Sequence, residues 1–230
     1  GMENHGKYGQ FVYTHKEDAL FVNLFVASEL NWKEKGIQLR QETGFPYAET
    51  SRITITQGKG KFAMQVRYPG WVKPGKFTVK VNGQPVSVIT GPSSYVTIDR
   101  QWKKGDVIDI QFPMHNSVKY LPNLTQYIAL MHGPIMLAMK TGTEDLAMLI
   151  ADDSRFGQLA VGKKLPIDQA PILINNDIEN IADQLQPVAG KPLHFTLSTK
   201  MVNEIRNELI PFFELHDARY MMYLAGSLRR

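Results

Sequence analysis

The sequence predicts an all-β protein made of two β-sandwich-like domains, of jelly-roll or immunoglobulin-like type, the second smaller and containing a short helix. Short runs of alternating apolar and polar residues recur along the chain, and Gly, Pro, Asn and Asp separate them. At 230 residues the chain is long enough to bury two β cores. We place the first domain at residues 1–120 and the second at 121–230.

The first strands follow from local patterns. Phe21–Val26 (FVNLFV) allows a helical or a strand interpretation, and its β-branched and aromatic content favours a buried strand. Arg52–Thr56 and Phe62–Tyr68 alternate strictly on either side of Gly58-Lys59-Gly60. This arrangement predicts a β-hairpin.

Asn82-Gly83 is the strongest turn signal in the chain, because a type I′ turn needs positive φ at both central residues. It predicts a hairpin between a strand at Phe77–Val81 and a return strand at Pro85–Ile89. Two further strands, Tyr95–Ile98 and Val107–Phe112, complete the predicted first domain.

The alternation of apolar and polar residues changes after residue 114. Leu121-Pro122-Asn123 predicts a loop at the domain junction. Tyr127–Met139, interrupted by Gly133-Pro134, is two short buried strands or one bent strand. Ile178–Leu185 predicts a short helix with Asn176 or Asp177 as its cap. The closing strands are predicted at Leu193–Leu197, Ile210–Leu215 and Arg219–Leu224.

Composition excludes several classes of function. The formal net charge is only +4, and the basic residues form no concentrated stripe, so we expect no nucleic-acid partner. No apolar run reaches the roughly 20 residues of a membrane span. The chain has no cysteine, which excludes disulfides, thiolate metal sites and a cysteine nucleophile. We expect no cofactor and no metal, and the polar N-terminus shows no secretory signal.

Several phrases resemble a known family. Leu39–Tyr47, Phe62–Trp71, Val79–Val86 and Tyr95–Met114 resemble the β-sandwich that follows the catalytic barrel in glycoside hydrolase family 127, the β-L-arabinofuranosidase-like family. In the second half, Ala151–Gly157, Pro187–Leu197 and Leu209–Leu224 resemble the small β domain that ends many such proteins. The resemblance covers nearly the whole chain, from Tyr8 to Leu224.

The resemblance implies chemistry that lies upstream of these domains. It implies a helical (α/α)6 barrel with a cysteine nucleophile, a glutamate acid/base and a zinc ion held by cysteine and glutamate, in which zinc lowers the pKa of the thiol. None of these positions has a match in this chain. We therefore expect a non-catalytic accessory region, inactive alone, that supports or contacts a barrel in the same protein or in another chain. A homodimer is a further expected partner, and a periplasmic or extracellular parent enzyme fits the family.

A second hypothesis is a stand-alone carbohydrate-binding module that binds plant-type carbohydrate. Trp32, Trp71 and Trp102 are the candidate sugar-contact residues, because an exposed aromatic face can stack on a sugar ring. The opposing interpretation is that these rings fill the core. At least two of them must be exposed on one face for the hypothesis to hold.

A third hypothesis is an autonomous enzyme built from two polar clusters. The first cluster is Asp152, Asp153 and Arg155, and the second is His216 and Asp217. A histidine beside a carboxylate can act as a general acid/base pair if the two clusters meet in a cleft. The structural alternative is an Asx-turn in which Asp153 pairs with Arg155, and a turn in which Asp217 accepts backbone hydrogen bonds.

Overall fold

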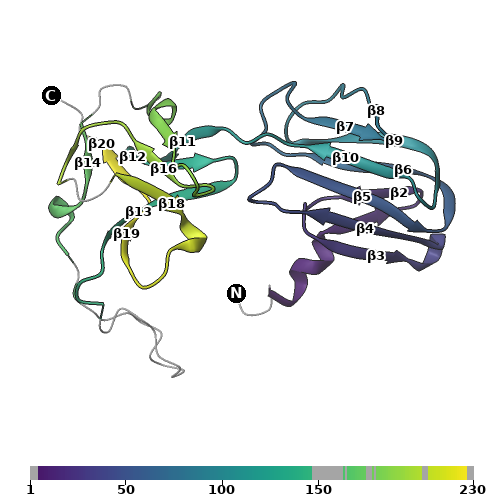
Figure 1. Ribbon diagram of the computed structural model, residues 1–230, viewed down its shortest axis with the longest axis horizontal. Helices are drawn as coiled ribbons and strands as arrows, with labels where there is room; N and C mark the ends of the chain where they lie inside the picture. Colours follow the sequence, from purple (N-terminus) through teal and green to yellow (C-terminus); the bar gives the residue numbers. More distant parts are fainter. Residues whose placement is uncertain are drawn as a thin grey trace. The chain divides into compact units, whose positions relative to one another are not determined.

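The computed structural model describes residues 5–146, 163, 165–174, 178, 180–203 and 207–226. The chain divides into two compact units, residues 1–115 and 116–230, and each is mostly β (Figure 1). The units are equal in length, whereas the sequence predicted a smaller second domain. Among the described residues, no helix is long and apolar enough to cross a membrane.

The first unit begins with the 3-10 helix η1 (His5–Phe11) and contains a four-stranded sheet in the order β1-β2-β6-β9. Strands β2 and β6 run parallel, and the other neighbours are antiparallel. The strands of this sheet are β1 (Tyr13–Lys16), β2 (Ala19–Val22), β6 (Lys59–Tyr68) and β9 (Ser94–Lys103).

A second, fully antiparallel sheet of the first unit has the order β3-β4-β5-β10-β7-β8. Its strands are β3 (Ser28–Trp32), β4 (Ile37–Thr43), β5 (Thr50–Gln57), β10 (Val107–Gln111), β7 (Thr78–Val81) and β8 (Gln84–Pro85), and η2 (Lys33–Lys35) joins β3 to β4.

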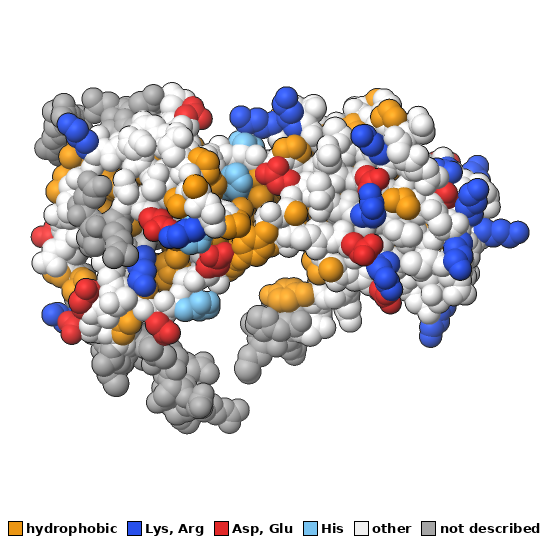
Figure 2. Space-filling model, viewed as in Figure 1, with side chains coloured by type: hydrophobic (Ala, Val, Ile, Leu, Met, Phe, Trp, Pro, Cys, Tyr) orange, Lys and Arg blue, Asp and Glu red, His pale blue; other side chains and the backbone are white. Residues whose placement is uncertain are grey.

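The two sheets of the first unit share one core. Alternate residues of β6, such as Met64 and Val66, pack in the same buried cluster as Ile53 and Ile55 of β5 and Ile108 of β10. The alternation seen in the sequence therefore reports one buried and one solvated face for each strand. Lys, Arg, Asp and Glu side chains are mixed over the visible face of this unit (Figure 2).

The predicted hairpin between Arg52–Thr56 and Phe62–Tyr68 is wrong. Both segments are strands, but β5 pairs with β4 and β10, whereas β6 pairs with β2 and β9 in the other sheet. The chain crosses from one sheet to the other at Gly58. Alternation identifies a half-buried strand but does not identify its neighbour, so two adjacent strands with a short connection were taken for partners.

Gly58 is required at this crossing for two reasons. Its φ is +89°, and a Cβ at this position would lie 2.1 Å from the carbonyl oxygen of Gly36. Gly105 has the same conformation, with φ of +90°, but open space around it. Positive φ costs a non-glycine residue about 1–2 kcal/mol.

We therefore expect Gly58→Ala to lower the free energy of unfolding by about 3 kcal/mol or more, because the clash adds to the backbone strain. Gly105→Ala is the matched control. We expect its free energy of unfolding to fall only by the roughly 1–2 kcal/mol that a positive φ costs a non-glycine residue. Urea unfolding followed by tryptophan fluorescence measures both losses. Equal losses in the two variants would contradict the role of the Gly36 contact.

Two other predictions for the first unit are confirmed in part. Asn82 and Gly83, with φ of +52° and +80°, form the β7–β8 hairpin, but the return strand is only Gln84–Pro85. The strand interpretation of Phe21–Val26 holds for Phe21 and Val22, at the end of β2. The following residues leave the sheet, and Phe25 alone among them turns into the core, where its ring stacks on Phe112 at 4.3 Å.

In the second unit a strand path β15-β16-β18-β13-β12-β20-β14-β17 is joined by β11 beside β12 and by β19 beside β13. The strands are β11 (Asn116–Leu121), β12 (Leu124–His132), β13 (Ile135–Gly142), β14 (Ile172–Leu173), β15 (Leu185–Pro187), β16 (Phe195–Leu197), β17 (Met201–Val202), β18 (Glu208–Pro211), β19 (Arg219–Met221) and β20 (Leu224–Gly226). Three short 3-10 helices lie among the described residues: η3 (Ile167–Gln169), η4 (Ile181–Gln184) and η5 (Phe212–Glu214).

Leu121-Pro122-Asn123 is a hairpin turn rather than a domain junction, because β11 pairs with β12 across it and Asn123 has a φ of +64°. Tyr127–Met139 does contain two strands, β12 and β13, which pair around Gly133-Pro134. The interpretation as two short buried strands is therefore confirmed.

The predicted helix at Ile178–Leu185 is shorter than expected and is a 3-10 helix. Ile181, Ala182 and Leu185 of this segment are buried in the core of the second unit. Asn180 occupies the N-cap position but its side chain makes no capping hydrogen bond, whereas Asn176 and Asp177 lie outside the described residues. At the C-terminal end, the predicted strand at Ile210–Leu215 becomes the end of β18 followed by η5.

Candidate functional site

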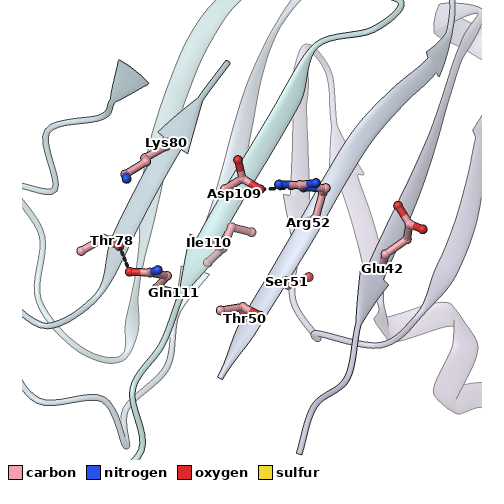
Figure 3. Close-up of a pocket in the computed structure, with 9 residues that line it drawn as sticks. All are labelled: Glu42, Thr50, Ser51, Arg52, Thr78, Lys80, Asp109, Ile110 and Gln111. Carbon is pink, nitrogen blue, oxygen red and sulfur yellow. Dashed lines mark hydrogen bonds and ion pairs between the residues drawn. The ribbon is translucent and has the colours of Figure 1, made fainter. Parts of the chain in front are cut away.

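The solvent-facing side of the six-stranded sheet carries a row of alternating charges. Strand register places Glu42 of β4 opposite Arg52 of β5, Arg52 opposite Asp109 of β10, and Asp109 opposite Lys80 of β7. The Arg52 Nε donates to Asp109 Oδ1 at 2.7 Å (Figure 3). This hydrogen bond raises the pKa of Arg52. Cross-strand pairs of opposite charge support a sheet register, so this charged row has a structural role in any case.

A second, uncharged row lies beside the charged row. Gln111 of β10 is opposite Thr50 of β5 on one side and Thr78 of β7 on the other. The Thr78 hydroxyl donates to Gln111 Oε1 at 3.2 Å (Figure 3). Both rows line one open groove of about 540 Å³, which lies entirely on the first unit. We call this surface the sheet groove.

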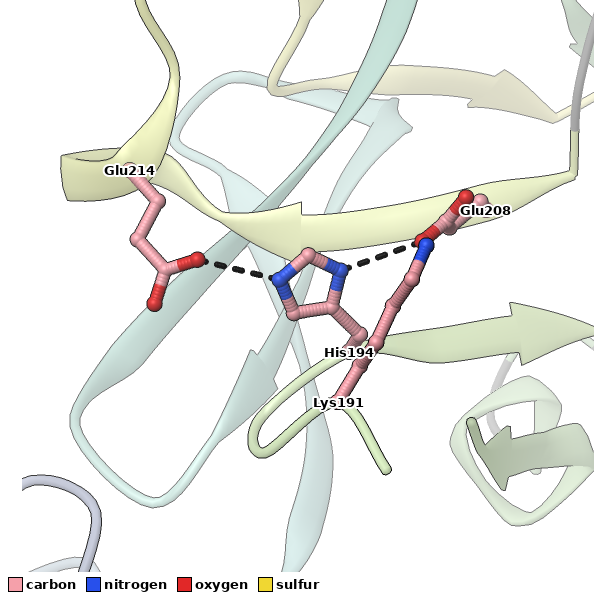
Figure 4. A network of polar contacts seen from close by, with 4 residues as sticks. All are labelled: Lys191, His194, Glu208 and Glu214. Atoms are coloured by element: carbon pink, nitrogen blue, oxygen red, sulfur yellow. Dashed lines mark hydrogen bonds and ion pairs between the residues drawn. The ribbon is translucent and has the colours of Figure 1, made fainter. Parts of the chain in front are cut away.

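The second unit contains a histidine held between two glutamates (Figure 4). His194 Nδ1 lies 3.1 Å from Glu208 Oε1, and its Nε2 lies 3.0 Å from Glu214 Oε2. Lys191 Nζ donates to the same Glu208 oxygen at 2.9 Å. Each imidazole nitrogen of His194 therefore lies within hydrogen-bonding distance of a carboxylate oxygen.

The Lys191 hydrogen bond, followed by that of His194, holds the pKa of Glu208 below its ordinary value of 4.5. The folded state therefore prefers the carboxylate. This stabilisation is fully present above pH 4.5 and is lost as the pH falls through the depressed pKa of the folded state. The side chain of Glu208 is 30% exposed, so we discount the effect for solvent screening, to about 0.5–1 kcal/mol.

We expect Glu208→Gln to destabilise the second unit more at pH 7 than at pH 3, because the stabilisation by the native carboxylate is lost as the pH falls through its lowered pKa. Hydrogen exchange of the amides in β16 and β18 at the two pH values measures this difference. Asp183→Asn, which removes an exposed carboxylate of the same unit, is the matched control. A loss of stability of the same size at both pH values would contradict an electrostatic role for Glu208.

The three tryptophans predicted as sugar contacts occupy different environments. Trp102 is fully buried, and its ring nitrogen donates to the Phe62 carbonyl at 3.0 Å. Trp32 is 5% exposed and meets Phe62 edge-on. Trp71 is half-buried, with its ring parallel to that of Phe45 at 6.0 Å. Trp32 and Trp102 are therefore core residues, and Trp71 is the one tryptophan that is not buried.

The structure describes only one of the two polar clusters. Asp152, Asp153 and Arg155 lie outside the described residues. His216 and Asp217 are exposed, and Asp217 lies in a turn with a φ of +46°. Within the described part of the chain, no group of three or more His, Asp, Glu or Cys side chains has a geometry that could hold a metal ion.

An exposed apolar surface lies near the beginning of the first unit. The buried Gln41 side chain donates from Nε2 to the carbonyls of Leu24 and Val26, at 2.9 and 2.8 Å. These bonds fix the segment after β2 with Phe25 inside and both neighbours outside. Phe11 is exposed as well, and it precedes Val12, whose carbonyl accepts a hydrogen bond from the Asn23 amide at 2.9 Å.

We call these three side chains the N-terminal apolar edge. Phe11, Leu24 and Val26 are 56%, 40% and 47% exposed, respectively. The signal for this surface, Leu24-Phe25-Val26, was visible in the sequence but was interpreted as part of a buried strand.

Two family models match consecutive parts of the chain, separated by residues 115 and 116. Residues 19–114 match the middle domain of the GH127 β-L-arabinofuranosidases, and residues 117–226 match DUF4986, a domain of unknown function. The first unit is thus similar in sequence to a GH127 middle domain, and the second unit to DUF4986. The boundary between the two matches lies where the chain divides into its two compact units.

Solved structures agree with this assignment. A GH127 β-arabinofuranosidase is 26% identical, with a TM-score of 0.66, and the match covers 94% of this chain and 36% of that one. A glycoside hydrolase at 22% identity has a TM-score of 0.62 and coverages of 94% and 37%. A GH127 β-L-arabinofuranosidase from Geobacillus stearothermophilus T6, at 21% identity, has a TM-score of 0.59 and coverages of 95% and 35%.

The chain thus spans about a third of the length of these three solved structures. The two structures below 25% identity support the fold alone. A search of the curated proteins finds no match to the chain.

Proposed function

We propose that this family 127 β-domain region is an accessory unit that braces a helical catalytic barrel. The observation that carries the proposal is the coverage: 94% of this chain matches a GH127 β-arabinofuranosidase, but only 36% of that enzyme matches this chain. The rest of the enzyme includes the barrel that the family resemblance implies. In this proposal the reaction belongs to the barrel, and the barrel lies in the same parent protein or in a separate chain.

The N-terminal apolar edge is the contact surface that we propose for the barrel. Exposed apolar side chains that group together on a soluble domain are typical of an interaction surface. Gln41 holds the backbone of Leu24 and Val26 from beneath, so the two side chains are presented in a fixed conformation. A pre-ordered surface loses less conformational entropy on binding than a flexible loop does.

The finer description of the fold is part of the same proposal. Two sheets around one core are what a β-sandwich of jelly-roll or immunoglobulin-like type requires, and the first unit has this arrangement. We propose that the two units, divided at His115 and Asn116, act as two domains. Homodimerisation through either domain is an alternative to contact with a barrel.

The proposal is tested by adding this chain to the catalytic barrel of a family 127 enzyme produced without its β domains. Sedimentation velocity measures the complex, and thermal unfolding measures the stability of the barrel. We expect a one-to-one complex and a more stable barrel. Leu24→Asp with Val26→Asp should abolish both effects, whereas Ile89→Asp, at a residue 91% exposed elsewhere on the same unit, should preserve them.

Absence of a complex with several family barrels, or a complex that Leu24→Asp with Val26→Asp leaves intact, would contradict the proposed surface. Self-association of this chain that the same two substitutions abolish would favour the homodimer instead.

A further inference from the structure

We propose that the sheet groove binds a neutral, hydroxyl-rich ligand, namely a short oligosaccharide. This inference goes beyond the accessory role, because the groove and the N-terminal apolar edge are formed by different residues. It also differs from the tryptophan hypothesis, since none of the described residues that line the groove is aromatic.

The dimensions of the groove suit a small ligand. Its volume of about 540 Å³ lies within the roughly 300–1,000 Å³ that is typical of small-molecule sites. The charged row extends over four adjacent strands, in the order β4, β5, β10 and β7. Neighbouring strands lie about 4.8 Å apart, so the charged row spans about 14 Å. An extended ligand of a few rings could follow this row.

The charges of the groove cancel. Glu42 and Asp109 contribute two negative charges, and Arg52 and Lys80 contribute two positive charges. A groove with no net charge gives neither an anion nor a cation a general electrostatic advantage. A neutral ligand avoids the cost of burying a charge beside a like charge.

The hydrogen-bonding groups of the groove match hydroxyls. Each sugar hydroxyl is both a donor and an acceptor. Lys80 offers only donors, the carboxylate of Asp109 retains acceptor sites beyond the one used by Arg52, and Gln111 offers an amide donor beside its bond from Thr78. Donors and acceptors thus alternate along the groove at the spacing of the strands. Without a stacking ring, we expect weak binding, with a Kd of about 1 mM.

The test is a titration of the full chain with arabinobiose, a neutral disaccharide, followed by NMR of the backbone amides. Digalacturonic acid and putrescine, tested in parallel, are the anionic and cationic probes. We expect arabinobiose to shift the amides of β5, β7 and β10 and to bind more tightly than either charged probe. Shifts that map to other strands, or no shifts at 50-fold excess over the expected Kd, would overturn the proposal.

Two variants probe the charge balance directly. Asp109→Asn leaves the charged row with a net charge of +1, so arabinobiose should bind several-fold more weakly and digalacturonic acid more tightly. Gln111→Ala should weaken binding of arabinobiose without changing the preference for charge. Both side chains lie on the solvent-facing side of β10, and thermal unfolding verifies that the variants remain folded.

Glu29→Gln with Arg40→Gln is the matched control. These residues form the same kind of exposed cross-strand ion pair, at 2.8 Å, on the same sheet, but they do not line the groove. We expect this variant to bind arabinobiose like the parent chain. An equal loss in the control and in Asp109→Asn would show that the sheet, rather than the groove, governs binding.

Discussion

Trp102→Ala is expected to lower the free energy of unfolding of the first unit by about 3–5 kcal/mol, which is the usual cost of truncating a buried tryptophan. The Trp102 ring is fully buried between the two sheets and packs on Phe62. Its ring nitrogen donates to the Phe62 carbonyl, which would lose that partner in the variant. Urea unfolding measures the loss.

Tryptophan fluorescence suits this measurement, because all three tryptophans of the chain lie in the first unit and two remain in the variant. Trp71→Ala is the control, and we expect it to lose clearly less stability because the Trp71 ring is only half-buried. If Trp102→Ala were as stable as the parent chain but bound sugar less well, the structural role would be contradicted and the predicted sugar-contact role supported.

The second large effect is expected at Asp106, where Asp106→Ala should cost about 3 kcal/mol. The buried carboxylate accepts hydrogen bonds from Asn82 Nδ2 at 2.9 Å and from the Lys103 amide at 3.0 Å, and Arg100 lies 3.8 Å away. Burial raises the pKa of Asp106, but these partners outweigh it and bring the pKa below its ordinary value. Removal of the carboxylate leaves donors unpaired inside the fold, at about 1–3 kcal/mol each.

This loss should depend on pH with a defined sign. The contribution of Asp106 is present above its ordinary pKa of 3.8 and is lost as the pH falls through the lowered value. Urea unfolding at pH 7 and pH 3 should therefore show a larger difference between Asp106→Asn and the parent chain at pH 7. Glu29→Ala, at an exposed ion pair of the same unit, should change stability by less than about 0.5 kcal/mol.

The sequence predicted the local elements of the fold well. The Asn82-Gly83 hairpin was found because its signal, positive φ at two adjacent residues, lies wholly within the turn. The pairing of Arg52–Thr56 with Phe62–Tyr68 was wrong because partner choice depends on distant strands. Ile53 of β5 lies opposite Ile108 of β10, which is far along the chain.

The same limit explains why the sheet groove was missed. Glu42, Arg52, Lys80 and Asp109 are ordinary exposed positions in four separate strands, and only register makes them neighbours. The tryptophans were singled out because residue type is visible in a sequence, whereas burial depends on which face of each strand meets the other sheet. Outward-facing charges of alternating sign on successive strands were the one available signal.

The parallel pairing of β2 with β6 has a consequence for how the first unit forms. Ala19 of β2 lies opposite Ala63 of β6. During synthesis, β2 can therefore pair with β6 only after more than 40 further residues have been added to the chain. Strands β3, β4 and β5 are neighbours along the chain and can pair as soon as they are synthesised. The other partner of β5 is β10, which is synthesised much later. Folds dominated by such distant pairings reach the native state slowly, because loop closure costs entropy before contacts compensate for it. During synthesis, β2 is therefore expected to remain an open edge until β6 emerges, a period in which a chaperone or a neighbouring strand can bind it.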